Sequence, residues 1–201
     1  MRYDVPVAQH RVEQAIDRSR FICTIAPADS VDAAQAFVRQ MNAEFADATH
    51  NCWAYVIGAP GSTDRIGMSD DGEPHGTAGR PMLTVLLHSG VGDIAAVVTR
   101  YYGGTKLGTG GLVKAYGGTV GLALQSLERR ARVDWVHAEI AVGYASIGAL
   151  QLLWPQYEIE VLRETYEADA RFSVRIPEER VEAARAAILD ATRGQAGFEL
   201  L

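Results

Sequence analysis

The chain has 201 residues, of which 48% are hydrophobic and 22% are charged, and its formal net charge is −6. This usage is typical of a folded globular protein and excludes a disordered chain, a collagen and a disulfide scaffold. The acidic balance argues against indiscriminate binding to nucleic acid, although it leaves room for a local basic face.

Charge and glycine are unevenly spread, which predicts two domains. Residues 1–132 hold 13 basic and 13 acidic side chains, whereas residues 133–201 hold 6 and 12, so the net charge belongs to the last third. Glycine is concentrated as well, because 16 of the 20 glycines lie between Gly58 and Gly121. We therefore expect a glycine-rich, charge-balanced domain over 1–132 and a smaller acidic domain over 133–201.

The sequence points to the cytoplasm. No apolar run approaches the ~20 residues of a membrane helix, and the first residues lack the apolar core of a signal peptide. The two cysteines, Cys23 and Cys52, lie in apolar surroundings without CxxC spacing. We expect a cytoplasmic protein without a membrane partner, in which both cysteines are buried thiols rather than a disulfide or a zinc site.

Two strands and a helix are predicted in the first half of the glycine-rich domain. Residues 20–26 and 52–57 are rich in aromatic and β-branched side chains, which favours strands. Between them, Ser30 can cap a helix whose apolar residues recur at intervals of three and four as far as Met41. Residues 58–79 are dense in Gly, Pro, Ser and Asp, which indicates a long loop that is either functional or mobile.

A helix, a buried strand and a second helix follow. Pro81 suits the first turn of a helix that continues through Leu86, because its missing N–H would be unpaired there. Residues 94–99 are almost wholly apolar and predict a strand buried on both faces. Residues 112–127 are helical in pattern despite their glycines, each of which costs about 1 kcal/mol relative to Ala.

The acidic domain has the clearest hydrophobic periodicity. Its expected elements are a strand over 136–144, a short helix over 146–154, a strand over 157–161, a strand over 170–176, a helix that begins near Glu178 and faces Val181, Ala184 and Ile188 inward, and a closing strand over 198–201. This β-α-β-β-α-β order is that of the ferredoxin-like split βαβ fold. The fold class expected for the whole chain is α+β.

The strongest chemical signal is the glycine-rich segment 100–114, which joins the predicted buried strand to the next helix. Its glycines free the backbone to turn, Thr109 can cap the helix, and the N–H groups of residues 110–112 would then point at an incoming anion. The segment is a candidate cradle for phosphate, a nucleotide or an RNA backbone.

The charge of the surrounding sequence also favours an anion-binding site at this segment. From Ile94 to Leu127 the chain has no acidic residue, and its basic side chains add up to +3. The segment matches neither a P-loop nor a GxGxxG dinucleotide loop, so a tight strand-to-helix turn without a ligand is the alternative reading. The residues assigned to an anion or nucleic-acid site are Arg100, Gly103, Gly104, Lys106, Gly108, Thr109, Gly110, Gly111 and Lys114.

A second signal is the acidic run from Asp70 to His75 (Asp-Asp-Gly-Glu-Pro-His). Its three carboxylates can hold Mg²⁺ through oxygen ligands or place a general base beside a bound phosphate. The alternative is that the two aspartates form turns or pair with Arg65, Arg80 or Arg100. The EF-hand spacing for calcium is missing, and no metal or other cofactor is assigned. The candidate polar site comprises His50, Asp70, Asp71, Glu73, His75 and Arg80.

His50 and Cys52 form a third signal. Lying two residues apart, they share one face if the strand extends to them, which would fit a Cys–His nucleophile or half of a metal site. No third partner can be placed, and neighbouring side chains on one strand seldom have nucleophile–base geometry. A structural histidine beside a buried cysteine is the preferred interpretation.

Four long stretches together resemble the YigZ/IMPACT family. They are Ser19–Ile22, Asp47–Tyr55, Ser69–Pro81 and Val98–Val113, in the family's order, and they cover about residues 19–125. Tyr102, Thr105 and His75 stand where the family commonly has Phe, Ile and Ser. Of these departures, His75 adds a titratable group beside the carboxylates.

The resemblance implies a fold for each domain and a link to translation. The N-terminal domain is expected to resemble the second domain of a small-subunit ribosomal protein, of left-handed βαβ type, a fold shared with elongation factor G and with GHMP-type small-molecule kinases. The C-terminal domain is expected to be ferredoxin-like, similar to the last domain of elongation factor G. Eukaryotic members of the family act in translational control under amino-acid starvation, through competition for a partner of a stress kinase.

Three functions fit these residues. The first is a non-enzymatic, translation-associated regulatory or binding protein whose segment 100–114 contacts RNA, the ribosome or a protein partner. The alternative is an enzyme that holds a phosphorylated or nucleotide substrate at the same segment, with Asp70, Asp71 or His75 as base or metal ligand. The third is a pure protein-interaction module. Fold alone does not choose among them, and the oligomeric state is not predicted.

Overall fold

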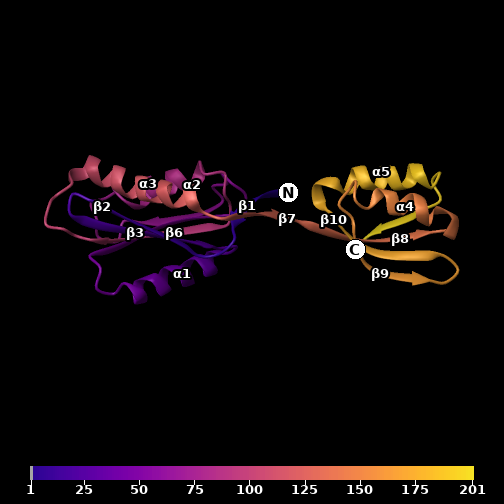
Figure 1. Cartoon of the computed structure of the whole chain (residues 1–201), viewed down its shortest axis with the longest axis horizontal. Helices are drawn as coiled ribbons and strands as arrows, with labels where there is room; N and C mark the ends of the chain where they lie inside the picture. Colours follow the sequence, from indigo (N-terminus) through magenta and orange to yellow (C-terminus); the bar gives the residue numbers. More distant parts are fainter. Residues whose placement is uncertain (1) are drawn as a thin grey trace. The chain divides into compact units, whose positions relative to one another are not determined.

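The computed structural model describes residues 2–201, whose backbone divides into two compact units. The N-terminal unit is Tyr3–Arg132, and the C-terminal unit is Val133–Leu201 together with Arg2. Both units contain helices and strands, so the chain is mixed α+β (Figure 1). None of the helices in this range has both the length and the apolar character that a bilayer span requires.

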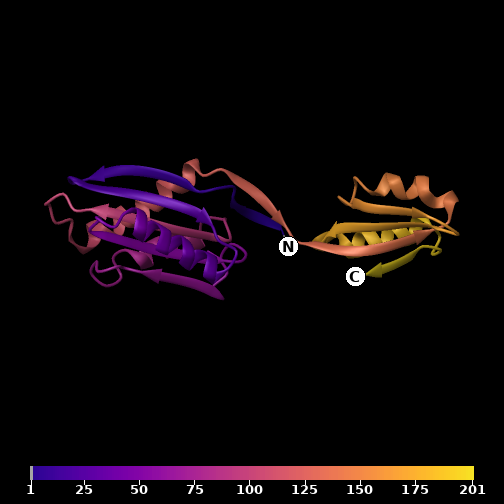
Figure 2. The same cartoon turned by 90° about the horizontal axis from the view of Figure 1, so that it is seen from below.

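A five-stranded antiparallel sheet forms the centre of the N-terminal unit. Its strands, in spatial order, are β2 (His10–Ile16), β3 (Ser19–Pro27), β6 (Ile94–Tyr101), β4 (His50–Ile57) and β5 (Arg65–Ser69). Figure 2 shows the β2–β3 hairpin at one edge of this sheet. Because β3 and β4 both run antiparallel to β6 between them, they are parallel to each other and are joined by a helical crossover. Every residue from 94 to 99 is buried, as the apolar sequence predicts.

Helices cover both faces of this sheet. Figure 1 shows α1 (Val31–Glu44) on one side and α2 (Gly79–Leu87) with α3 (Gly108–Ser126) on the other. Ser30 caps α1, as predicted, because its Oγ accepts a hydrogen bond of 3.2 Å from the N–H of Ala33. The sheet therefore has one core under α1 and a larger core under α2 and α3.

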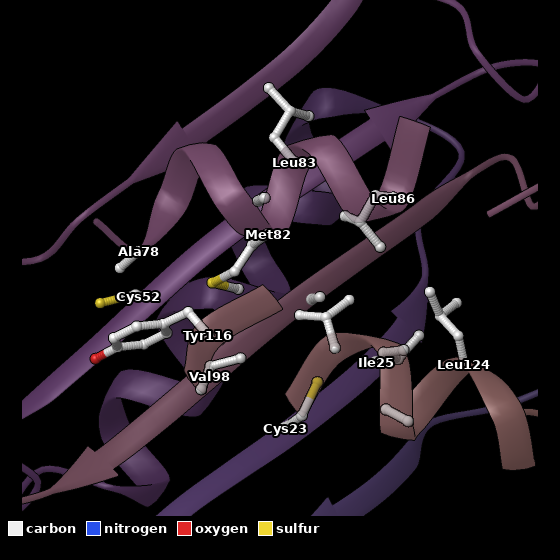
Figure 3. Close-up of a cluster of buried hydrophobic side chains, with 14 of the residues drawn as sticks. Cys23, Ile25, Cys52, Ala78, Met82, Leu83, Leu86, Val98, Tyr116 and Leu124 are labelled. Atoms are coloured by element: carbon white, nitrogen blue, oxygen red, sulfur yellow. The ribbon is translucent and has the colours of Figure 1, made fainter. Parts of the chain in front are cut away.

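The larger core supports the candidate site. Figure 3 shows Met82 and Leu86 of α2 and Tyr116 of α3 among the buried side chains, together with the two cysteines. Cys23 and Cys52 are both buried and free, as predicted. Burial raises the pKa of the Cys23 thiol to about 12 and also raises that of Cys52, so neither sulfur is a thiolate at neutral pH.

Several strands between residues 2 and 133 are not predicted from the sequence pattern. Besides β2 they are β5 and the pair β1 (Arg2–Pro6) and β7 (Arg129–Val133), which form a separate two-stranded sheet. β5 lies inside the stretch 58–79, which the composition predicts to be a loop throughout. Its central Gly67 is required, because a Cβ there would lie 2.3 Å from the ring of Tyr55 on β4. An edge strand with a glycine at its centre lacks the apolar alternation by which strands are detected.

The helix α3 begins earlier than its pattern predicts. It starts at Gly108 rather than near Leu112, and no side chain caps it. Thr109, the predicted cap, lies inside the helix instead. The N–H groups without a partner inside the helix are therefore those of the turn that starts at Gly108. The sequence predicts them at residues 110–112 instead.

The C-terminal unit has the predicted ferredoxin-like order. Its elements are β8 (Trp135–Val142), α4 (Ile147–Leu153), β9 (Glu160–Tyr166), β10 (Ala170–Pro177), α5 (Val181–Ala191) and β11 (Gly197–Leu200), with short 3-10 turns at Tyr144–Ser146 and Glu178–Arg180. The antiparallel sheet has the order β11-β8-β10-β9, and Figure 1 shows both helices on one side of it. The strand predicted over 157–161 begins later, at Glu160, because Glu158 turns the chain with a φ of +53°.

The core of the C-terminal unit follows the predicted alternation. On β10, four alternate residues from Ala170 to Ile176 are buried. Against them pack Val181, Ala184 and Ile188 of α5, which are buried as well. Period-two burial on the strand and three- or four-residue spacing on the helix thus meet in one core.

Candidate functional site

A cavity of about 450 Å³ opens beside the first turn of α3. Two segments that the sequence singles out meet at it, namely the acidic run and the glycine-rich segment that follows β6. The residues that line the cavity are Glu73, Pro74, Arg100, Tyr102, Lys106, Leu107, Gly108, Thr109 and Leu112. Its volume is within the range of small-ligand sites.

The floor of the cavity is a buried ion pair. Arg100, near the end of β6, donates from Nη1 to Oε1 of Glu73 over 2.6 Å, and the two side chains are 6% and 4% exposed. Tyr116 donates from its hydroxyl to the same oxygen over 2.8 Å. Removing either member of such a pair leaves an uncompensated buried charge, so the pair ties the acidic run to β6. Contrary to the sequence expectation, Arg100 therefore adds no free positive charge to the segment.

The partners of Arg100 do not use all of its donors. Its Nη2 donates to Oγ of Ser19 across 3.4 Å, and its Nε finds no hydrogen-bond partner within residues 2–201. The guanidinium carbon lies 5.4 Å from the ring centroids of both Phe21 and Tyr102. Because buried donors almost always find acceptors, the unpaired Nε is an exception in the floor of the cavity.

The first turn of α3 gives the cavity a positive end. This turn has no acidic residue, its N–H groups lack partners inside the helix, and the helix dipole favours an anion there. Lys106 is exposed and lines the same cavity, so it adds a positive charge to this end. Gly110 and Gly111 follow in the helix without lining the cavity, and Lys114 is exposed farther along α3. A phosphate or a carboxylate is the ligand group that suits this end.

Two glycines shape the turn between β6 and α3 without lining the cavity. At Gly103 a Cβ would lie 1.9 Å from the carbonyl oxygen of Arg18, so glycine is required where the chain passes the β2–β3 turn. The N–H of Gly103 donates to Oγ of Ser19 over 3.1 Å and anchors the segment. Gly104 has a φ of +87° in open space, a conformation that glycine adopts readily.

Asp70 is occupied by the backbone of its own loop. Its carboxylate accepts the N–H groups of Gly76, Ala78 and Gly79 at 2.7, 3.0 and 2.8 Å. Partial burial opposes ionisation, but these three donors together outweigh it and lower the pKa of the Asp70 carboxyl below its ordinary value. A carboxylate held in this way is a weak base and a poor metal ligand, which favours the predicted turn over the predicted catalytic role.

Asp71 and His50 belong to one hydrogen-bonded turn. Asp71 has a φ of +42°, and its Oδ2 accepts the N–H of Asn51 over 2.6 Å. The carbonyl oxygen of Asp71 accepts from Nδ1 of His50 over 2.6 Å. The Nε2 of His50 lies 3.9 Å from Oε2 of Glu73, so this histidine approaches the ion pair of the floor without lining the cavity.

Cys52 does not form a nucleophile with His50. Its Sγ donates to the carbonyl oxygen of Asp70 over 2.9 Å, and burial raises the pKa of the thiol. A nucleophilic cysteine requires the opposite, a lowered pKa that yields a thiolate. Across the part of the chain that the structure describes, no group of three or more His, Cys, Asp or Glu side chains is placed to hold a metal ion.

The other predicted polar residues lie away from the cavity. His75 is fully exposed, with its Nδ1 3.9 Å from Oδ2 of Asp70. Arg80 is exposed on α2 and does not line the cavity. Of the polar set, only Glu73 reaches it. The structure thus brings together one member of the polar set and about half of the predicted anion-binding set.

Five side chains of the site are not among the residues predicted for it. Pro74, Tyr102, Leu107 and Leu112 line the cavity, and Tyr116 reaches Glu73 from 43 positions away. No local pattern reveals so distant a contact. The one available signal is the position of Tyr102, an aromatic residue placed directly after a buried strand and before two glycines.

Comparisons with known proteins agree with this architecture. Residues 17–124 match the Impact N-terminal domain, and residues 140–195 match a domain of unknown function, DUF1949. The chain is 44% identical over 190 residues to IMPACT family member YigZ of Escherichia coli (strain K12), with 94% of this chain and 93% of the relative covered. It is 38% identical over 199 residues to an IMPACT family member of Haemophilus influenzae, with 99% and 97% covered. A crystal structure described as that of a hypothetical protein is 42% identical, with a TM-score of 0.68 and with 100% of this chain and 97% of the other covered.

Proposed function

Because the chain belongs to the IMPACT family, we propose that it is a non-enzymatic, translation-associated protein that binds RNA through residues 102–111. One observation carries the proposal, namely the uncapped N-terminus of α3 with Lys106 exposed beside it. Together they offer unpaired backbone donors and a positive charge to the backbone phosphates of RNA, which are the same whatever the base sequence.

The charge of α2 and α3 supports an anionic partner. Neither helix contains an acidic residue, and the only two lysines of the chain, Lys106 and Lys114, are exposed at and along α3. Arg80 is exposed on α2 and adds a third positive charge. The net negative charge belongs to residues 133–201, whereas residues 1–132 hold equal numbers of basic and acidic side chains, so the N-terminal unit has no net charge that would oppose an anion.

The geometry does not favour the enzymatic alternative. Asp70 and Asp71 accept backbone N–H groups, and His75 does not line the cavity, so none of the three faces a phosphate bound at α3. A general base must lie within hydrogen-bond reach of the group it deprotonates. The two aspartates hold the backbone of their own turns instead.

Salt-dependent RNA binding tests the proposal. Lys106→Ala should weaken binding of a short RNA and lower the slope of log affinity against log salt by about one unit, because one phosphate contact is lost. Arg39→Ala is the matched control, since it removes an exposed positive charge from α1, on the other side of the sheet. This control should leave the slope unchanged.

Co-sedimentation with ribosomes, with and without nuclease, supplies the second arm. RNA binding requires that nuclease release the protein and that Lys106→Ala weaken the association. Association that survives nuclease treatment would indicate a protein partner instead. A salt slope that Lys106→Ala does not alter contradicts the proposed contact.

A further inference from the structure

A phosphate contact alone does not account for the cavity beside α3. Three apolar side chains, Pro74, Leu107 and Leu112, line it together with Tyr102. An isolated phosphate gains nothing from such walls, because burying a charge against apolar groups is unfavourable. The walls suit a flat, largely apolar group that is attached to the anion.

We propose that the cavity binds the base of one unpaired RNA nucleotide, whose phosphate lies at the first turn of α3 beside Lys106. The inference rests on the proposed function and deepens it, because it turns a contact with any RNA backbone into a preference for single strands. The volume of about 450 Å³ is within the range that ligands of nucleotide size occupy.

Tyr102 is the stacking surface of this site. It is 46% exposed, and the guanidinium of Arg100 lies 5.4 Å from its ring centroid. Glu73 and Ser19 accept hydrogen bonds from that guanidinium and fix it in place. The ring is therefore oriented in advance by a cation–π contact, which reduces the entropy lost when a base stacks on it. Exposed aromatic rings of this kind are the usual platforms for unpaired bases.

The unpaired Nε of Arg100 distinguishes a base from a purely apolar ring. It is a buried donor on a side chain that lines the cavity, and it has no partner within residues 2–201. Each RNA base carries carbonyl oxygens or ring nitrogens at its edge that accept hydrogen bonds. A base that fills the apolar space can therefore offer this donor an acceptor once the Arg100 side chain shifts to expose its Nε, whereas an apolar ring offers none.

Double-stranded RNA cannot use the cavity. In a duplex the base edges are paired and the base faces are stacked on their neighbours, so no base is free to enter. The phosphates of a duplex still reach the first turn of α3 and Lys106. Duplex RNA should therefore bind through the phosphate contact alone and more weakly than a single strand.

A short pyrimidine strand with one 2-aminopurine, alone or annealed to its complement, tests this inference on the full chain. The fluorescence of 2-aminopurine is quenched when the base stacks on an aromatic ring. We expect tighter binding of the single strand than of the duplex, and quenching only with the single strand.

Variants of Tyr102 separate stacking from phosphate binding. Tyr102→Ala should weaken single-strand binding by roughly five- to 150-fold and abolish the quenching, whereas Tyr102→Phe keeps the ring and should keep both. Tyr144→Ala is the matched control, because Tyr144 is 52% exposed in the C-terminal unit and should affect neither readout. Lys106→Ala should weaken binding of both RNAs and leave the quenching at saturation unchanged.

The possible results distinguish this inference from the proposed function. Equal affinity for single strand and duplex, or quenching that persists in Tyr102→Ala, overturns the inference and leaves the proposed function standing. No binding to either RNA or to ribosomes overturns the proposed function and the inference with it.

Discussion

Two segments of the N-terminal unit have sequences suited to ligand binding, yet the fold uses their polar groups in opposite ways. In the acidic run, Asp70 accepts three backbone N–H groups, Asp71 accepts one, and Glu73 pairs with Arg100. Residues 102–111 of the glycine-rich segment instead present an uncapped helix end and an exposed lysine. A polar motif thus indicates a binding site only where the fold leaves its donors or acceptors unpaired.

Because of this difference, we expect substitutions in the two segments to change different properties of the protein. Substitutions in the acidic run break internal contacts and should act on the free energy of unfolding. Substitutions at exposed positions of the glycine-rich segment should act on affinity for RNA and leave the free energy of unfolding unchanged. Variants that affect both properties equally would remove the distinction.

The largest effect is expected at Glu73. Glu73→Ala leaves the guanidinium of Arg100 and the hydroxyl of Tyr116 without their acceptor, and should lower the free energy of unfolding by about 3–5 kcal/mol, measured by urea denaturation. Glu44→Ala is the control, since it breaks an exposed Arg11–Glu44 pair of the same 2.6 Å length and should leave the midpoint unchanged. Equal losses for the two variants would contradict a structural role for the buried pair.

Asp70→Ala should have the next largest effect. Three backbone N–H groups lose their acceptor, which should lower the free energy of unfolding by about 2–3 kcal/mol. Thermal unfolding measures the change, with Asp64→Ala as the control because it removes an exposed carboxylate from the same part of the chain. If the two variants unfold at the same temperature, the three hydrogen bonds do not stabilise the loop.

The contribution of Asp70 should also depend on pH. Its pKa in the folded state is lowered from an ordinary value of about 3.9, so its contribution is complete above that value and disappears as the pH falls through the folded pKa. The difference in free energy of unfolding between wild type and Asp70→Asn should therefore be constant above about pH 5 and shrink below about pH 4. Urea midpoints across this range measure it, and a difference that stays constant at low pH would contradict the lowered pKa.

The smallest effect on stability is expected at Lys106. Its side chain is exposed, so Lys106→Ala should leave the urea midpoint where it is in the wild type while it weakens RNA binding. Measuring both properties on one preparation provides the sharpest contrast with Glu73→Ala. A lowered midpoint in Lys106→Ala would show that the glycine-rich segment also stabilises the fold.

Local patterns predict the C-terminal unit well because its strands alternate regularly between buried and exposed residues, as β10 does from Ala170 to Ile176. They miss β5, because the position of Gly67 is dictated by the ring of Tyr55 on a neighbouring strand. The candidate site shows the same limit. Its two segments are visible in the sequence, but the pairing of Glu73 with a residue 27 positions away depends on the folded sheet.

The placement of the cysteines has a practical consequence. Cys23 on β3 and Cys52 on β4 are both register partners of Val98, one on each side of the central strand β6. Residues 133–201 contain no cysteine. Both thiols lie in the core under α2 and α3, so a thiol reagent should modify the chain only when that core opens, and the rate of modification measures local opening of the N-terminal unit alone. The two cysteines thus report how often this core opens.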